Sequence, residues 1–270
     1  MIVAHTRCFD FGLSGSFPMK WLSFVLCVAC SLAAAPAQSA EIKVLTAGAF
    51  KPVVVALAPD FEKRSGHRLI IDNDTAGGLT KRIENGEAFD VTFLPPASLT
   101  GLTQRMFTAA QPQADVARVA IGVAVKDGAP APIISTTEAL KAALLNAKSI
   151  AVIDPKAGGS SGLYLADLFQ KWGIAETLKP KLVLVPGGLV AQKVVNGEAD
   201  LALHQISEIL AVPGARLIGP LPAEIQNYTV YRGAIAAKTT QEEAARALLA
   251  YLQGPEAKAV LQQKGMEAAP

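Results

Sequence analysis

The sequence has few cysteines, almost no net charge and no cluster of metal ligands, and each of these features argues against a class of function. The 270 residues include three cysteines, Cys8, Cys27 and Cys30, so the chain beyond residue 30 has no disulfide, thiol nucleophile or sulfur ligand for a metal. The net charge is +2 without any basic run, which argues against nucleic acid as a partner. No His, Asp and Glu residues have the spacing of a metal site, and we expect neither a metal nor another cofactor.

Long apolar runs are also missing, except for one near the start of the chain. The run from Trp21 to Ala35 is too short for a comfortable membrane span, and it follows the positive charge of Lys20. Small residues continue to Ala40, a composition typical of a secretory signal peptide. We therefore predict a signal peptide over residues 1–40 and a protein that works in an exported compartment.

Several details of this leader stay open from the sequence. Cleavage fits after Ala37 or after Ala40, and residues 1–18 add nothing to an export signal, which suggests a start mis-assigned upstream of Met19. Cys30 makes a poor lipoprotein box because the usual leucine three residues before it is absent, so we expect no lipid anchor. The remaining ~230 residues are enough to bury a large core.

Strand and helix patterns alternate along this remainder, which predicts α/β layers with mostly parallel sheets. The helix that starts at Lys51 has an apolar face, and Pro59 inside it predicts a kink or a split. Ser135 and Glu138 have the spacing of a capping box for a later helix. The predicted strands are residues 42–46, 68–72, 89–94, 119–125, 149–153, 182–185, 201–204, 216–218 and 228–236.

Two of these strands cross between two halves of the chain. One crossing is expected near residues 119–125 and the return near 228–236, so the terminal helices rejoin the first half. We predict one lobe from residues 41–120 and 233–270, and a second lobe from residues 121–232. Two lobes joined by two extended strands are a hinge suited to closing on a ligand, and we expect a monomer.

A glycine-rich unit occurs twice, as Gly77-Gly78-Leu79 before Asn85-Gly86-Glu87-Ala88, and as Gly187-Gly188-Leu189 before Asn196-Gly197-Glu198-Ala199. Each copy predicts a glycine pair that opens a short helix, then a glycine after the helix, then a strand. Helix starts that face each other across a cleft attract anions, because their free N–H groups converge. A chance match of a common helix stop is the alternative.

The segment Gly158-Gly159-Ser160-Ser161-Gly162 fits two kinds of site. It matches the nucleophile-elbow pattern of serine hydrolases, but Pro155 and five further residues separate Ser160 from its strand, and an elbow serine follows its strand directly. An anion-binding loop at a helix start fits better, and an ordinary helix cap is compatible with it. No lysine follows as in a phosphate-binding loop, which argues against nucleotides.

Other small or polar residues stand where strands end. Residues 46–50 and 75–78 allow a ligand close to the backbone, although tight strand–helix packing explains them equally well. His204 and Gln205 end the strand of the second glycine unit, where α/β folds place ligand contacts. A structural role in the core is the alternative for His204.

Four motifs in a fixed order resemble the periplasmic solute-binding proteins of ABC importers, in the branch that includes the molybdate-binding proteins. The similarity runs over nearly the whole chain after the leader. The motifs are Ala47-Gly48-Ala49-Phe50; Thr75–Ile83 with Gly86–Val91; Asp154-Pro155 with Gly162-Leu163-Tyr164-Leu165; and Gly197-Glu198-Ala199 with His204–Ile209.

The resemblance implies a two-lobed type 2 binding-protein fold, with two mixed, mostly parallel sheets flanked by helices. It also implies a small anionic ligand and a membrane permease as partners. The family's hydroxyl-bearing ligand residues correspond to Ala49, to Ala76 or Gly77, and to Gln205 here, so we expect an organic carboxylate instead of molybdate. The expected ligand contacts are Gly48, Ala49, Phe50, Thr75, Ala76, Gly77, Ser160, Ser161, Val190 and Gln205.

The same branch includes a periplasmic aconitate isomerase, so an isomerase on this scaffold is the alternative function. It needs a base in the cleft, for which His204 and Glu208 are the first candidates, followed by Lys51 and Tyr231. Strand alternation puts His204 and Gln205 on opposite faces. We expect Gln205 to face the cleft and His204 to pack beneath it, which favours binding over catalysis.

Overall fold

The computed structural model describes residues 39–269. The predicted leader and the predicted absence of an anchor at Cys30 concern residues outside this range, apart from Ser39 and Ala40 at its edge. None of the helices between residues 39 and 269 combines the length and hydrophobicity of a membrane span.

One nine-stranded mixed sheet runs through the described residues in the order β2-β1-β3-β9-β4-β7-β5-β6, and β8 pairs with β4. β1 is parallel to β2 and β3, and β5 to β6 and β7, whereas β4 and β9 are antiparallel to each other and to their neighbours. The predicted α/β class is confirmed. The strands are β1 (Glu41–Ala47), β2 (Arg68–Asp74), β3 (Val91–Leu94), β4 (Thr108–Lys126), β5 (Ile150–Ile153), β6 (Leu182–Val185), β7 (Leu201–Gln205), β8 (Ala215–Pro220) and β9 (Tyr228–Ala236).

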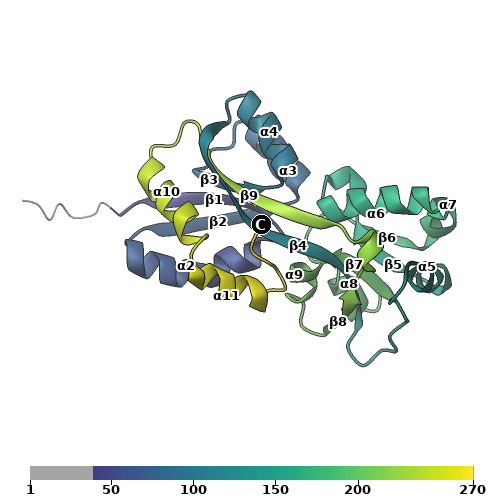
Figure 1. The fold of residues 1–270 in the computed structure, drawn as a ribbon. Coiled ribbons are helices and arrows are strands. Elements are labelled where there is room, and N and C mark those ends of the chain that lie inside the picture. Colours follow the sequence, from purple (N-terminus) through teal and green to yellow (C-terminus); the bar gives the residue numbers. More distant parts are fainter. Residues whose placement is uncertain (1–38, 270) are drawn as a thin grey trace, which may run out of the picture. The chain divides into compact units, whose positions relative to one another are not determined.

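Helices connect these strands in two groups. α2, α3, α4, α10 and α11 lie with the sheet around β1, and α5 to α9 lie with the sheet around β5 (Figure 1). Their bounds are α2 (Lys51–Ser65), α3 (Ala76–Glu84), α4 (Pro96–Gln104), α5 (Thr137–Asn146), α6 (Ser160–Lys171), α7 (Ala175–Leu178), α8 (Gln192–Val195), α9 (Ile206–Ile209), α10 (Glu242–Tyr251) and α11 (Pro255–Gln263).

The buried side chains form separate cores around the two parts of the sheet. The first core combines Phe50 and Phe93 with residues of the terminal helices, such as Leu248. In the second part, Val152 of β5 belongs to one core and Ala151 to another, because neighbouring residues of a strand point to opposite faces. Both faces of the second part are therefore covered.

Two strands connect these cores. β4 is longer than the predicted strand, and it supplies Val119 to the first core and Ile121 to the second. β9 pairs with β4 between Tyr228 and Ala236. Figure 1 shows the two strands running side by side between the groups of helices. The division into lobes at residues 120 and 233 stays a prediction.

Four local predictions are wrong in detail. Pro59 does not break α2, because it lies on the exposed side of the helix, where water can satisfy the carbonyl of Val55. Thr136, and not Ser135, caps α5 by accepting a hydrogen bond from the N–H of Ala139. Gly159 occupies the cap of α6, so neither serine after it is a cap. The second glycine unit does not open a helix at its glycines, since α8 starts only at Gln192.

Candidate functional site

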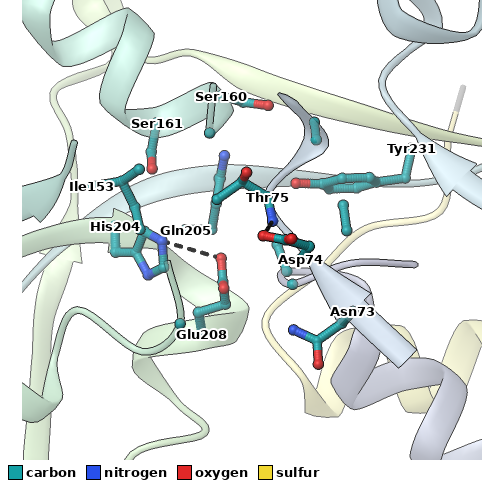
Figure 2. A pocket seen from close by; sticks show the side chains of 16 residues that line it. Asn73, Asp74, Thr75, Ile153, Ser160, Ser161, His204, Gln205, Glu208 and Tyr231 are labelled. Carbon is teal, nitrogen blue, oxygen red and sulfur yellow. Dashed lines mark hydrogen bonds and ion pairs between the residues drawn. The ribbon is translucent and has the colours of Figure 1, made fainter. Parts of the chain in front are cut away.

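A pocket lies where the segments that follow β1, β2, β5 and β7 meet (Figure 2). The empty space in it is about 410 Å³, open mouth included. Residues from both parts of the sheet line it: Ala47, Gly48, Ala49, Asn73, Asp74, Thr75, Ala76, Ile153, Gly159, Ser160, Ser161, Gly188, His204, Gln205, Glu208 and Tyr231.

The start of α3 supplies one wall of the pocket. Thr75 caps this helix, because its hydroxyl oxygen accepts a hydrogen bond of 3.0 Å from the N–H of Gly78. The same hydroxyl donates to the carbonyl of Ala157 on the far side of the pocket, at 2.5 Å. The N–H of Gly77 also crosses over, to the carbonyl of Gly158 at 3.1 Å. The two sides of the pocket are therefore in direct contact here.

The start of α6 supplies the opposite wall. Ser160 and Ser161 are its first two residues, and the N–H groups of a first helical turn have no acceptor within the helix. Both side chains line the pocket, and Ser161 is only 2 % exposed. Two hydroxyl groups and a helix start therefore border the same pocket, an arrangement suited to an anion.

His204 and Glu208 meet inside the pocket, 3.3 Å apart between His204 Nε2 and Glu208 Oε2 (Figure 2). β7 ends at Gln205, and α9 follows without a loop, which carries Glu208 back over His204. Burial raises the pKa of Glu208 to about 8 and lowers the pKa of His204 to about 3. Since burial disfavours the charge on each partner, it favours a contact between two neutral groups.

Gln205 and Tyr231 complete the polar lining. The side-chain amide of Gln205 donates to the hydroxyl of Thr229 at 2.9 Å, and its Oε1 is buried without a partner. The Tyr231 ring stacks on Phe50, with ring centres 6.1 Å apart, and its hydroxyl points toward the middle of the pocket. Burial raises the pKa of this hydroxyl, so Tyr231 is a neutral hydrogen-bond donor.

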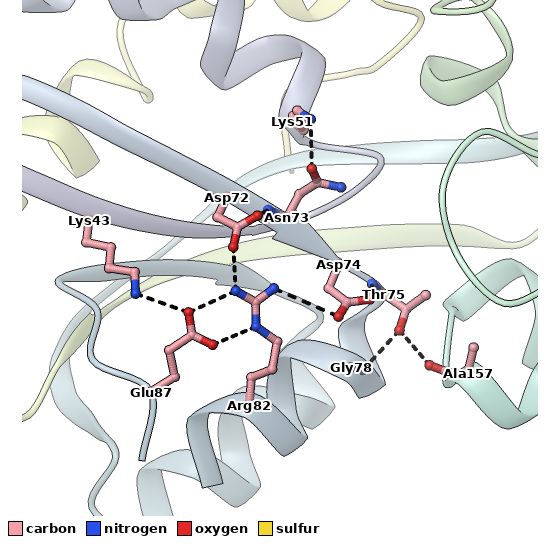
Figure 3. A network of polar contacts seen from close by, with 10 residues as sticks. All are labelled: Lys43, Lys51, Asp72, Asn73, Asp74, Thr75, Gly78, Arg82, Glu87 and Ala157. Atoms are coloured by element: carbon pink, nitrogen blue, oxygen red, sulfur yellow. Dashed lines mark hydrogen bonds and ion pairs between the residues drawn. The ribbon is translucent and has the colours of Figure 1, made fainter. Parts of the chain in front are cut away.

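Charge is unevenly distributed around the pocket. Its lining includes the carboxylates Asp74 and Glu208 but neither lysine nor arginine among the described residues. Arg82 lies behind Asp74, 3.9 Å away, and its guanidinium is held by Asp72 and by Glu87, the latter at 2.6 Å (Figure 3). Lys51 lies next to the lining, where its Nζ donates to Asn73 Oδ1 at 2.7 Å (Figure 3). Within the lining formed by the described residues, a ligand therefore meets no lysine or arginine.

The pocket brings together most of the residues expected from the sequence. Phe50, Gly77 and Val190 do not line it: Phe50 lies behind Tyr231, Gly77 contacts Gly158, and Val190 is fully buried in the second part. The other expected residues line the pocket, as do the candidate bases His204 and Glu208; they are Gly48, Ala49, Thr75, Ala76, Ser160, Ser161 and Gln205. Ligand contact by any of them stays a prediction.

His204 is buried, as expected, but it does not pack beneath the cleft. His204 and Gln205 both line the pocket, because it lies at the end of β7, where both faces of the strand border it. The sequence analysis also missed Asn73 and Asp74, since the predicted strand stopped at residue 72. β2 reaches Asp74, and polar residues at a strand end were the available signal.

A comparison with known proteins identifies the family of this chain. Residues 42–267 match the bacterial extracellular solute-binding proteins. The chain belongs to this family. It is 33 % identical over 245 residues to an aconitate isomerase of Pseudomonas sp., covering 88 % of this chain and 91 % of the relative. It is 29 % identical over 251 residues to the molybdate-binding protein of Azotobacter vinelandii, covering 89 % and 95 %.

Solved structures of two binding proteins share the fold. The periplasmic molybdate-binding protein of Azotobacter vinelandii matches with a TM-score of 0.71 and 22 % identity, over 85 % of this chain and all of the other. The sulfate-binding protein SubI of Mycobacterium tuberculosis matches with a TM-score of 0.69 and 17 % identity, over 85 % and 87 %. The predicted resemblance, the type 2 fold and the solute-binding function are confirmed.

Proposed function

We propose that this solute-binding protein closes on a small organic carboxylate in the periplasm and delivers it to the permease of an ABC importer. The start of α6 at the pocket carries this proposal. Its first N–H groups have no acceptor within the helix, and the hydroxyls of Ser160 and Ser161 line the pocket. At the start of α3, by contrast, the N–H groups of Gly77 and Gly78 are already bonded to Gly158 and Thr75. Helix starts bind anions through such N–H groups and the positive end of the helix dipole.

A carboxylate fits this pocket better than molybdate does. By the resemblance, Ala49, then Ala76 or Gly77, and Gln205 replace hydroxyl donors of the molybdate-binding proteins, and each lost donor costs about 1–3 kcal/mol in a buried anion site. The apolar side of the pocket, with Ile153 and the Tyr231 ring, suits the carbon skeleton of an organic anion.

A thermal-shift screen with the chain from residue 41 onward tests this function. The panel consists of mono-, di- and tricarboxylates together with molybdate, tungstate and sulfate. A ligand at 100 times its Kd adds about 2.7 kcal/mol to the free energy of unfolding. We expect stabilisation by at least one carboxylate and none by molybdate. Submicromolar binding of molybdate would contradict the proposal.

The His204–Glu208 contact favours isomerisation as a second candidate function. Aconitate has a CH₂ carbon between a carboxylate and the double bond, and its protons are acidic for that reason. An ionised Glu208 would take one of them, the double bond would shift, and a proton would return to the far carbon, so that no atom is gained or lost. The raised pKa of Glu208 lies close to the operating pH, as a general base requires.

Proton NMR in D₂O separates the two functions. The protein is incubated with cis- or trans-aconitate, and the isomer ratio and deuterium incorporation are followed. An isomerase converts both isomers and loses this activity in Glu208→Gln and His204→Asn. Glu176→Gln serves as the control, because its side chain is 85 % exposed and remote from the pocket lining. Saturable binding without conversion supports a purely binding role.

A further inference from the structure

The charges around the pocket conflict with the binding of an anion. Glu208 is only 7 % exposed and lines the pocket, yet no lysine or arginine in the described residues joins it there. An ionised Glu208 would repel a ligand carboxylate at hydrogen-bond distance, with little water to screen the repulsion. Either the ligand is not an anion, or Glu208 carries no charge when the ligand is bound.

The position of Glu208 favours the second possibility. Its Oε1 lies against Gly48, where even a Cβ atom would come within 2.6 Å of it. Because Gly48 has no side chain, it leaves room for the carboxyl group of Glu208 at the pocket, between β1 and α9. Oε2 contacts His204, and Oε1 lies beside Gly48, which itself lines the pocket.

We propose that Glu208 is protonated in the ligand complex and donates its carboxyl proton to a carboxylate of the ligand. The inference rests on the proposed function and deepens it, because the protein then binds its ligand together with a proton held at Glu208. In this arrangement His204 Nε2–H donates to Oε2, and Oε1–H donates to the ligand. The ligand class is a carboxylate, since its oxygen can share a proton with a carboxylic acid in a short hydrogen bond.

The charges of the groups around Glu208 are consistent with a protonated Glu208. His204 of β7 is neutral, because it is buried and its Nδ1 has no hydrogen-bond partner. Tyr231 of β9 is a neutral donor, and Asn73 of β2 is uncharged. Asp74 is the other carboxylate of the lining and adds further negative charge. None of these groups stabilises an ionised Glu208.

Calorimetric titration of the chain from residue 41 onward, between about pH 6.5 and about pH 9.5, tests the inference. The probes are trans-aconitate and the carboxylates found in the screen, whose own carboxyl groups titrate below this range. Above the titration of Glu208 we expect the affinity of the wild-type protein to fall about tenfold per pH unit. In two buffers of different ionisation enthalpy, binding at about pH 9 should take up close to one proton.

The variants separate this inference from the function on which it rests. Glu208→Gln keeps a donor at the same place, so its affinity should stay flat with pH and exceed that of the wild type about tenfold or more at pH ~9.5. Glu176→Gln should keep the wild-type profile. A flat wild-type profile, or an unchanged slope in Glu208→Gln, overturns the inference alone. Binding of no carboxylate at pH ~7 overturns the proposed function as well.

Discussion

At the residue scale, His204 and Glu208 make the stability of the protein depend on pH in opposite directions. Between its folded pKa of about 3 and its ordinary value of 6.5, His204 binds a proton only in the unfolded chain, so stability rises with pH. Between its ordinary value of 4.5 and its folded pKa of about 8, Glu208 binds a proton only in the folded chain, so stability falls. The two effects oppose each other from 4.5 to 6.5.

Of these two residues, only Glu208 changes the free energy of unfolding between pH 6.5 and 8. A prediction follows for this pH range. The free energy of unfolding of the wild type should fall there by about 2 kcal/mol, from about 1.36 kcal/mol per pH unit over about 1.5 units. Glu208→Gln should remove this fall. Urea denaturation at the two pH values measures both, and a wild-type stability that stays constant would show that Glu208 is ionised in the folded protein.

At the element scale, the start of α6 predicts which hydroxyl matters for the ligand. Ser161 is buried in the pocket wall, and its hydroxyl can add one hydrogen bond to a bound anion. Ser161→Ala should weaken carboxylate binding about tenfold, equivalent to about 1.4 kcal/mol, with little change in the unfolding midpoint. Thr100→Ala, which removes an exposed hydroxyl on α4, is the matched control. Equal affinity in both variants by calorimetry would remove Ser161 from the site.

The elements themselves were predictable to different degrees. β9 was predicted with its observed bounds, because a β-branched and aromatic run is a strong strand signal. The first half of β4 was missed, since its residues are mixed in polarity and are held by pairing with β9, a contact that no local pattern encodes. The meeting of His204 with Glu208 was missed for a similar reason: it depends on α9 following β7 without a loop.

At the scale of the whole molecule, the two sides of the pocket touch where Gly77 meets Gly158. A Cβ at either glycine would lie 2.8 Å from the Cα of the other, so a side chain there would prevent this approach. Binding proteins of this fold enclose a ligand by domain closure, and a ligand gains affinity only from contacts made in the closed form. The Gly77–Gly158 contact should therefore limit how far the protein closes.

Two glycine variants separate closure from backbone strain. Gly158 and Gly173 have similar left-handed φ angles of 73° and 67°, but a Cβ at Gly173 meets nothing within 4 Å. Gly158→Ala and Gly173→Ala should therefore lose similar stability, about 1–2 kcal/mol each, from the left-handed alanine. Only Gly158→Ala also holds the sides of the pocket apart, so it alone should weaken carboxylate binding, by about tenfold or more. Small-angle scattering should show that ligand compacts the wild type and Gly173→Ala more than Gly158→Ala. Equal affinity and equal compaction in the two variants would mean that closure does not depend on the Gly77–Gly158 contact.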